Sequence, residues 1–264
     1  MPYPRKIAFV TAATDHGTLI INRYDYHSTV AGRAYGVGIE LLERASREAN
    51  EINLAQRLLE LRRKYFGDGV VAIDGGANIG THTVEWAKAM TGWGSVLAIE
   101  AQERIYYALA GNIAINNCFN ARAIHGALAQ QRGIMKIPTL DYTLPGSFGS
   151  FGLKDQNQTN LVGQAIDTSE ANAIDVQAVS VDSLGLDRVD LIKLDIEGME
   201  LEALEGATHC IASSYPILMV EWTSSDKNRL RSWMENLHYS VFEQDMNFIA
   251  VHQTDKCLEH INKM

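Results

Sequence analysis

The stretch Ile73-Asp-Gly-Gly-Ala-Asn-Ile-Gly80 decides how the fold is interpreted. It follows the apolar run at residues 70–73, which is typical of a buried strand, and precedes residues 81–90, where the pattern predicts a helix. Glycines at such a turn let the backbone approach a ligand closely, and open α/β sheets bind ligands outside the carboxyl ends of their strands. The stretch therefore predicts an α/β fold with a ligand site at this turn.

The same alternation of strand and helix continues along the chain. It predicts a doubly wound parallel sheet covered on both faces, closed by an antiparallel hairpin. Strands are expected at residues 70–73, 95–99, 121–127, 190–195 and 217–220, helices at 81–90, 102–116, 200–212 and 226–237, and the hairpin at 240–243 and 248–252.

Two segments lie outside this pattern. Residues 1–66 combine a strand at 18–22 with apolar residues at helical spacing over 39–66, and are expected to form a cap on a main domain at 67–264. Residues 138–175 are rich in Gly, Ser, Asn, Gln and Asp, so we expect either a substrate-side lid or a floppy insertion.

Smaller features flank these segments. Gly133 is expected in a hairpin turn, residues 176–179 in an edge or hairpin strand, and Arg62-Arg63-Lys64 at a solvated helix end.

Composition excludes several classes of protein. The 264 residues carry 23 Lys and Arg against 32 Asp and Glu, a net charge of -9, which disfavours nucleic acid as a partner. No apolar run approaches the roughly 18 residues of a membrane helix, so no membrane partner is expected. Three well-separated cysteines suggest neither disulfides nor zinc, and we expect a cytoplasmic protein. A homo-oligomer is left open.

The glycine turn departs from the dinucleotide fingerprint Gly-x-Gly-x-x-Gly, because counting from Gly76 the second glycine is replaced by Asn78. Asp74 at the strand end suits a cationic amino acid better than a pyrophosphate. Glu100 closes the second strand, 20 residues after Gly80, where an acid typically binds ribose hydroxyls. Together these residues favour S-adenosylmethionine, with S-adenosylhomocysteine as its product. The alternative is that Asp74 and Glu100 only cap helices beside a tight turn.

Longer motifs strengthen this interpretation. The chain contains, in this order, the motif Asp74-Gly-Gly-Ala-Asn-Ile-Gly80-Thr-His-Thr83, the residue Glu100, and the motifs Asn112-Ile-Ala-Ile-Asn116 and Val189-Asp-Leu-Ile-Lys-Leu-Asp-Ile-Glu-Gly198-Met-Glu200. In these, the chain resembles the FkbM family of S-adenosylmethionine-dependent methyltransferases over roughly residues 69–222. The resemblance implies a seven-stranded methyltransferase sheet and O-methylation of a hydroxyl on a sugar or other small molecule, with residues 1–66 and 138–175 deciding the acceptor. The expected cofactor residues are Asp74, Gly75, Gly76, Ala77, Asn78, Gly80, Thr81, His82, Glu100, Ala101, Gln102, Gly126, Ala127 and Asp195.

Acidic residues at two neighbouring strand ends mark the acceptor side. Asp195 and Glu221 are expected to face one crevice, with Lys193 and Glu197 beside them. We expect a general base that takes the proton of the acceptor hydroxyl, with Lys193 holding the carboxylate or the developing oxyanion. The structural alternative is an internal salt bridge with helix capping by Glu197. Mg²⁺ at these carboxylates is a second alternative, which the charge of Lys193 disfavours, so no metal ligand is assigned.

Two other functions remain open. A nicotinamide-dependent oxidoreductase would use a similar sheet, but lacks support from the glycine pattern. A non-catalytic S-adenosylmethionine-binding interaction module would not need Asp195 and Glu221.

Overall fold

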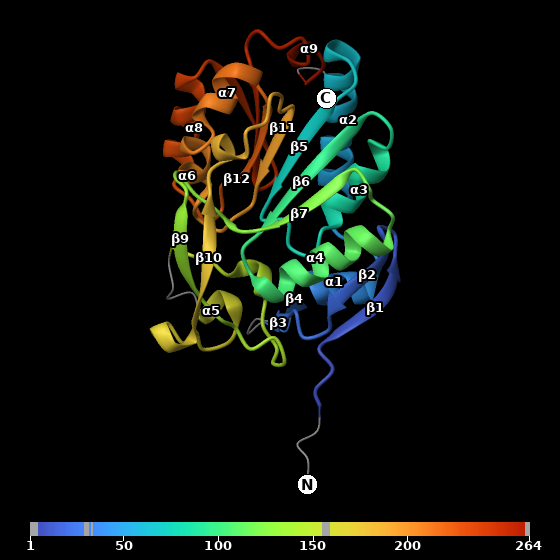
Figure 1. Ribbon diagram of the computed structural model, residues 1–264, viewed down its shortest axis with the longest axis vertical. Helices are drawn as coiled ribbons and strands as arrows, with labels where there is room; N and C mark the ends of the chain where they lie inside the picture. Colours follow the sequence, from blue (N-terminus) through green and yellow to red (C-terminus); the bar gives the residue numbers. More distant parts are fainter. Residues whose placement is uncertain (1–4, 29–31, 33, 155–158, 262–264) are drawn as a thin grey trace.

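A seven-stranded sheet forms the centre of the protein. The computed structural model describes residues 5–28, 32, 34–154 and 159–261. The strand order is β13-β14-β12-β11-β5-β6-β7 (Figure 1). Five strands are parallel, β14 runs antiparallel to β12, and β13 runs antiparallel to β14, which confirms the expected sheet and its terminal hairpin. The strands are β5 (Val70–Gly75), β6 (Gly94–Glu100), β7 (Ala121–His125), β11 (Leu191–Leu194), β12 (Ile217–Glu221), β13 (Tyr239–Gln244) and β14 (Asn247–His252).

The two faces of this sheet belong to two separate cores, because successive side chains of a strand point to opposite faces. In β12, Ile217 and Met219 belong to one core, whereas Leu218 and Val220 belong to the other. Helices α2 (Ala49–Phe66) and α3 (Thr81–Ala89) pack on the first core. Helices α6 (Glu200–Glu205), α7 (Thr208–Ser214) and α8 (Lys227–Asn236) pack on the second (Figure 1). The sheet is therefore doubly wound.

The N-terminal segment packs against the main sheet and its helices. Strands β1 (Phe9–Thr14) and β2 (Gly17–Asn22) form a hairpin that lies on α4 (Glu103–Ile115). Asn112 of α4 accepts a hydrogen bond from the Ile20 amide at 2.6 Å and donates one to the Ile20 carbonyl at 3.2 Å. The expected strand at 18–22 is thus confirmed, and the side chain of Asn112 fastens it to α4.

Two helices, not one continuous helix, occupy residues 39–66. Strands β3 (His27–Ser28) and β4 (Ala34–Tyr35) precede α1 (Val37–Arg44), and α2 follows after a short turn. Ala45 and Glu48 in this turn have positive φ values, so the backbone leaves the helical conformation there. Residues 1–4, 29–31 and 33 of the predicted cap lie outside the described residues, and its boundary at residue 66 stays a prediction.

A small second sheet corrects three expectations. The predicted strand at 121–127 divides at Gly126 into β7 and β8 (Ala127–Leu128), and β8 pairs with β10 (Ala173–Val179). Gly133 begins strand β9 (Gly133–Pro138) instead of lying in a hairpin turn. The strand expected at 176–179 as an edge or hairpin strand is the central one of the order β8-β10-β9, and it pairs antiparallel with β9. These pairings join residues 35 to 51 positions apart, which local pattern does not reveal.

The described parts of the predicted lid pack against the N-terminal segment. They contain the short helices η1 (Phe148–Ser150), α5 (Thr159–Val162) and η2 (Glu170–Asn172). Asp25 is buried and accepts hydrogen bonds from the Phe148 amide at 3.1 Å and the Gly38 amide at 3.3 Å. Burial raises the pKa of Asp25 to about 7 against the effect of these donors. Residues 155–158 of the predicted lid lie outside the described residues.

The predicted helix at 200–212 is broken. Gly206 separates α6 from α7, and a Cβ there would lie 2.3 Å from the Ala129 carbonyl oxygen, so the chain needs glycine at this close approach. The short helix η3 (Val181–Leu184) precedes β11. Helix α8 begins as expected, because the Asp226 side chain accepts a hydrogen bond from the Arg229 amide.

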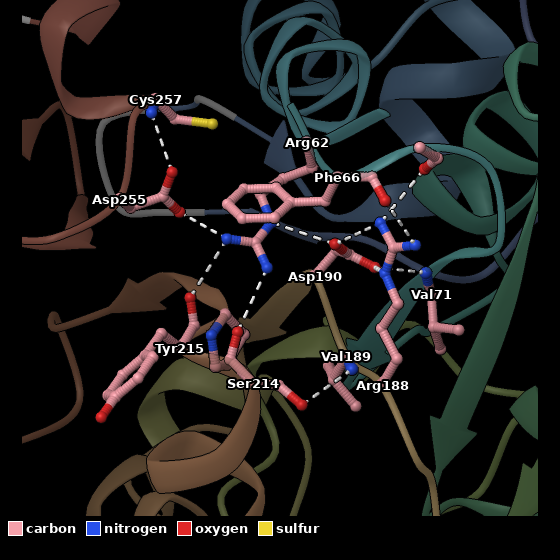
Figure 2. A network of polar contacts seen from close by, with 12 residues as sticks. Arg62, Phe66, Val71, Arg188, Val189, Asp190, Ser214, Tyr215, Asp255 and Cys257 are labelled. Atoms are coloured by element: carbon pink, nitrogen blue, oxygen red, sulfur yellow. Dashed lines mark hydrogen bonds and ion pairs between the residues drawn. The ribbon is translucent and has the colours of Figure 1, made fainter. Parts of the chain in front are cut away.

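A buried ion-pair network holds α2 to the amino end of the sheet (Figure 2). Arg62, 4% exposed, lies 3.0 Å from Asp190 and 2.5 Å from Asp255, and Arg188 also contacts Asp190 at 2.8 Å. The expectation of a solvated helix end is therefore wrong for Arg62, although Arg63 beside it is exposed. Asp255 precedes the last helix, α9 (Leu258–Ile261), so the network also fixes the C-terminal segment.

None of the helices in the described part of the chain is both long enough and apolar enough to cross a membrane.

Candidate active site

A cavity of about 640 Å³ lies at the carboxyl ends of β5, β6, β11 and β12. The chain leaves β5 for β6 and β7 on one side and returns to β11 on the other, so the cavity occupies the switch point of the sheet. Residues between Tyr35 and Glu51, residues 147–153 and Leu161 provide further walls. The N-terminal segment and the 138–175 loop thus enclose the site that the sheet creates.

The glycine turn crosses directly over the end of β11. Gly76 has a φ of +73°, and a Cβ at this position would lie 1.8 Å from the Asp195 carbonyl oxygen. The amides of Gly76 and Ala77 donate to the Ile99 carbonyl at 3.0 and 3.1 Å. Glycine is therefore needed at position 76 because the turn is held tightly between β6 and β11.

Glu100 closes β6 at the cavity wall and is almost fully buried. Its carboxylate accepts hydrogen bonds from the amides of Asn78 at 3.0 Å and Gln102 at 2.7 Å. Burial raises the pKa of Glu100 to about 7, although these donors oppose the shift. An acid held in this way beside the glycine turn fits the predicted binding of ribose hydroxyls.

Three of the predicted cofactor residues lie behind the cavity wall. Asp74 is fully buried, accepts a hydrogen bond from the Thr83 hydroxyl at 2.6 Å, and has one carboxylate oxygen without a partner among the described residues. Gly75 and Gly80 also lie outside the lining. The other predicted cofactor residues do line the cavity: Gly76, Ala77, Asn78, Thr81, His82, Glu100, Ala101, Gln102, Gly126, Ala127 and Asp195.

The four predicted catalytic residues come together in the cavity. Asp195, Glu197 and Glu221 each place a carboxylate oxygen within 4.8 Å of the other two. The Lys193 ammonium lies 3.3 Å from the Asp195 carboxylate. Burial alone would lower the pKa of Lys193, but the neighbouring carboxylates, chiefly Asp195, raise it overall. Lys193 is therefore charged at neutral pH.

The carboxyl groups beside Asp195 titrate unusually. Burial, together with the charges of Asp195 and Glu197, raises the pKa of Glu221 to about 9. Burial also raises the pKa of Glu197 to about 7, against a hydrogen bond of 2.5 Å from the Ser224 hydroxyl. Strongly perturbed acids in a cavity are typical of functional sites.

Several cavity residues carried no signal in the sequence. Arg47, Glu48 and Glu51 lie near the start of α2, and Asn247 begins β14 opposite Glu221. No motif marks them, because their position in the cavity depends on how the N-terminal segment packs.

The fold and the cavity define a class of protein. The strand order, the single antiparallel strand inside the sheet and the cavity beside the glycine turn are those of an S-adenosylmethionine-dependent methyltransferase. A family model described as "Methyltransferase FkbM domain" matches residues 74–241, and the chain belongs to this family.

One solved structure of an FkbM methyltransferase supports the fold. An FkbM methyltransferase from Methylobacillus flagellatus KT superposes with a TM-score of 0.50 at 16% identity, over 73% of this chain and 48% of that one. This chain therefore spans about half the length of that protein. A putative caffeoyl-CoA O-methyltransferase from Staphylococcus aureus gives a TM-score of 0.47 at 11% identity, over 81% and 88% of the two chains. A comparison with curated proteins finds no match.

Proposed function

We propose that this methyltransferase transfers the methyl group of S-adenosylmethionine to a hydroxyl of a small molecule or glycan, with Asp195 as general base. The observation that supports this proposal is the cluster of Asp195, Glu197 and Glu221 beside Lys193 on the wall of the cavity. A hydroxyl is a weak nucleophile until its proton is removed, and a carboxylate within hydrogen-bond reach can accept that proton. The cluster supports oxygen as the acceptor atom for this reason.

S-Adenosylmethionine, when bound, supplies an electrophilic methyl group on a sulfonium. The buried carboxylate of Glu100 and the amides of the turn at residues 76–78 offer the polar partners that a nucleoside needs. We propose that Glu100 binds the ribose hydroxyls and that residues 76–78, Thr81, residues 101–102 and residues 126–127 hold the rest. Asp74, behind the wall, supports the turn through Thr83.

In the transfer itself, the acceptor oxygen forms a bond to the methyl carbon while the carbon–sulfur bond breaks and its electron pair stays on sulfur. Asp195 takes the hydroxyl proton during this step. Lys193 holds the Asp195 carboxylate in place at 3.3 Å and stabilises the negative charge that develops on oxygen. Burial and the charge of Asp195 raise the pKa of Glu221, which disfavours the carboxylate form that a base needs. Much of the rate then comes from holding the reactants in line.

Mg²⁺ at Asp195, Glu197 and Glu221 is the alternative to a free base, since three carboxylates suit a hard cation. We favour the metal-free base because the Lys193 ammonium already provides a positive charge beside Asp195.

We propose that residues 1–66 and 138–175 select the acceptor, because both segments contribute to the cavity walls. We also propose a cytoplasmic location, which the three buried free cysteines support, and no nucleic-acid partner, which the net charge of -9 supports.

The proposal is tested with S-adenosylmethionine labelled with ¹³C in the methyl group and a panel of hydroxyl-bearing sugars and small molecules. We expect the label in a methoxy group of one acceptor class, identified by NMR. Label found in N-methyl or C-methyl groups, with no methoxy product, would overturn the O-methylation assignment while leaving the family membership unchanged.

A further inference from the structure

His82 lies between two carboxylates on a different wall of the cavity. It belongs to the first turn of α3, and Glu48 and Glu51 belong to the start of α2. The distance from Nδ1 of His82 to Glu48 Oε2 is 3.6 Å, and from Nε2 to Glu51 Oε1 it is 3.2 Å. His82 is 4% exposed, so this arrangement is shielded from bulk water.

Two buried atoms at this place have no hydrogen-bond partner among the described residues. They are Nε2 of His82 and Oδ1 of Asn247. The Nε2 atom contacts Glu51 Oε1 at 3.2 Å as an ion pair, whereas Asn247 donates from its Nδ2 to Glu51 Oε2 at 3.0 Å and leaves its Oδ1 unpaired. Leaving a buried polar atom unpaired costs about 1 to 3 kcal/mol, so such atoms point to a ligand.

The chemistry of these atoms identifies the ligand as a cation. A neutral imidazole nitrogen, a carboxylate oxygen and an amide oxygen each offer a lone pair. His82 Nε2 and Glu51 Oε1 lie 3.2 Å apart, and two ligands at right angles around an ion with bonds near 2.1 Å are separated by about 3 Å. Imidazole favours transition metals over Mg²⁺ or Ca²⁺.

We propose that Glu51, His82 and Asn247 bind a divalent transition-metal ion, with Glu48 facing the other ring nitrogen of His82. Histidines that bind metals through one ring nitrogen commonly present the other to a carboxylate, which fixes the orientation of the ring. The ion ties α2, α3 and β14 together at the cavity. It is separate from the cluster of Asp195, Glu197 and Glu221, which contains no imidazole.

The nearby positive charges leave this site net negative. Arg47 forms ion pairs with Glu48 and Glu40, and Lys193 lies closest to Asp195 while its charge also reaches Glu51. The negative charges of Glu48 and Glu51, together with those of Glu40 and Asp195, exceed the positive charges of Arg47 and Lys193. The site can therefore balance the charge of an added cation.

The test uses the whole chain, stripped with EDTA, desalted and titrated with Mn²⁺ alone. We expect saturable binding by EPR, and a nitrogen coupling from imidazole in the pulsed spectrum of the wild type. Among the described residues that line the cavity, His82 is the one histidine. Mn²⁺ bound without nitrogen coupling would overturn the proposal, and this readout needs no variant.

Matched variants locate the ion. Glu51→Gln should weaken Mn²⁺ binding by at least about tenfold, whereas Glu197→Gln, an equally conservative change in the other cluster, should leave it unchanged. The opposite pattern would place the ion at Asp195 and overturn the proposal. Absence of saturable binding in the wild type would show that His82 forms only an internal ion pair with Glu51. Because no methyl acceptor is needed, this result does not depend on the proposed function.

Discussion

The two ends of the parallel sheet differ in how far their acidic and basic side chains balance one another. At the amino end, Arg62 and Arg188 are matched by Asp190 and Asp255 at 2.5 to 3.0 Å (Figure 2). At the carboxyl end, two cationic residues, Arg47 and Lys193, share the cavity with seven carboxylic acids: Glu40, Glu48, Glu51, Glu100, Asp195, Glu197 and Glu221. Matched charges fix the fold at one end. At the other end acids outnumber cations, and the pKa values of three of these acids, Glu100, Glu197 and Glu221, are raised by burial.

The largest expected effect concerns the carboxyl end. Asp195→Asn should lower turnover by about 10²- to 10⁴-fold, since the amide cannot accept the acceptor's proton, and Glu221→Gln should lower it much less. Single-turnover rates with S-adenosylmethionine and the identified acceptor measure both. Equal losses in the two variants would favour a shared Mg²⁺ ion over a base.

Chelation sharpens this result. We expect the Glu51→Gln variant to keep its turnover in EDTA. Because this variant lacks the proposed transition-metal site, any effect of EDTA on it would come from the Asp195 cluster. If EDTA abolished turnover in that variant and Mg²⁺ restored it, Asp195 would be a metal ligand.

Removing Arg62 from the ion-pair network at the amino end of the sheet should lower the free energy of unfolding. Arg62→Leu leaves Asp190 and Asp255 buried with fewer partners, which we expect to cost about 3 to 5 kcal/mol of unfolding free energy. The adjacent Arg63→Leu is the control, because Arg63 pairs with Asp68 at the exposed surface and should cost at most about 1 kcal/mol. Urea denaturation compares them. Similar costs for both variants would show that burial of the pair contributes nothing.

Cofactor binding should depend on one acid of the carboxyl end. S-Adenosylhomocysteine should raise the melting temperature and NAD should not, since a ligand at one hundred times its dissociation constant stabilises by about 2.7 kcal/mol. Glu100→Gln should weaken binding by about 1 to 3 kcal/mol in calorimetry. Glu103→Gln, at the start of α4 outside the cavity, serves as its control. Unchanged affinity in Glu100→Gln would exclude Glu100 as the ribose ligand.

The last prediction is a pH dependence of stability. Because the pKa of Glu221 rises from 4.5 to about 9 on folding, the native state binds the extra proton, and its stabilising effect is complete below pH 4.5 and lost as the pH rises toward 9. Glu221→Gln cannot lose this proton, so its melting temperature should fall less than that of the wild type between pH 5 and about 9. Parallel curves would show that Glu221 is not protonated in the folded protein.

The contrast between the two ends also explains what the sequence could predict. Glu100 and the turn around Gly76 lie at the ends of strands that the sequence marks by short apolar runs, so local pattern predicts both their structure and their place at the cavity. The burial of Arg62 depends on Asp190 and Asp255, which lie 128 and 193 positions away, and three basic residues in a row look like a solvated surface. Glu51 and Asn247 are hydrogen-bonded although they lie 196 positions apart in the sequence. Contacts of this kind are fixed by tertiary packing, which leaves no local periodicity.

The tight crossing at Gly76 limits how this enzyme can diverge. The donor turn touches the peptide of Asp195 so closely that position 76 cannot accept even a methyl side chain without moving the proposed base. The proposed donor turn and the proposed base are thereby coupled through one backbone contact. We propose that the acceptor is selected instead at wall residues such as Tyr35, Ser150 or Leu161, which lie outside that crossing.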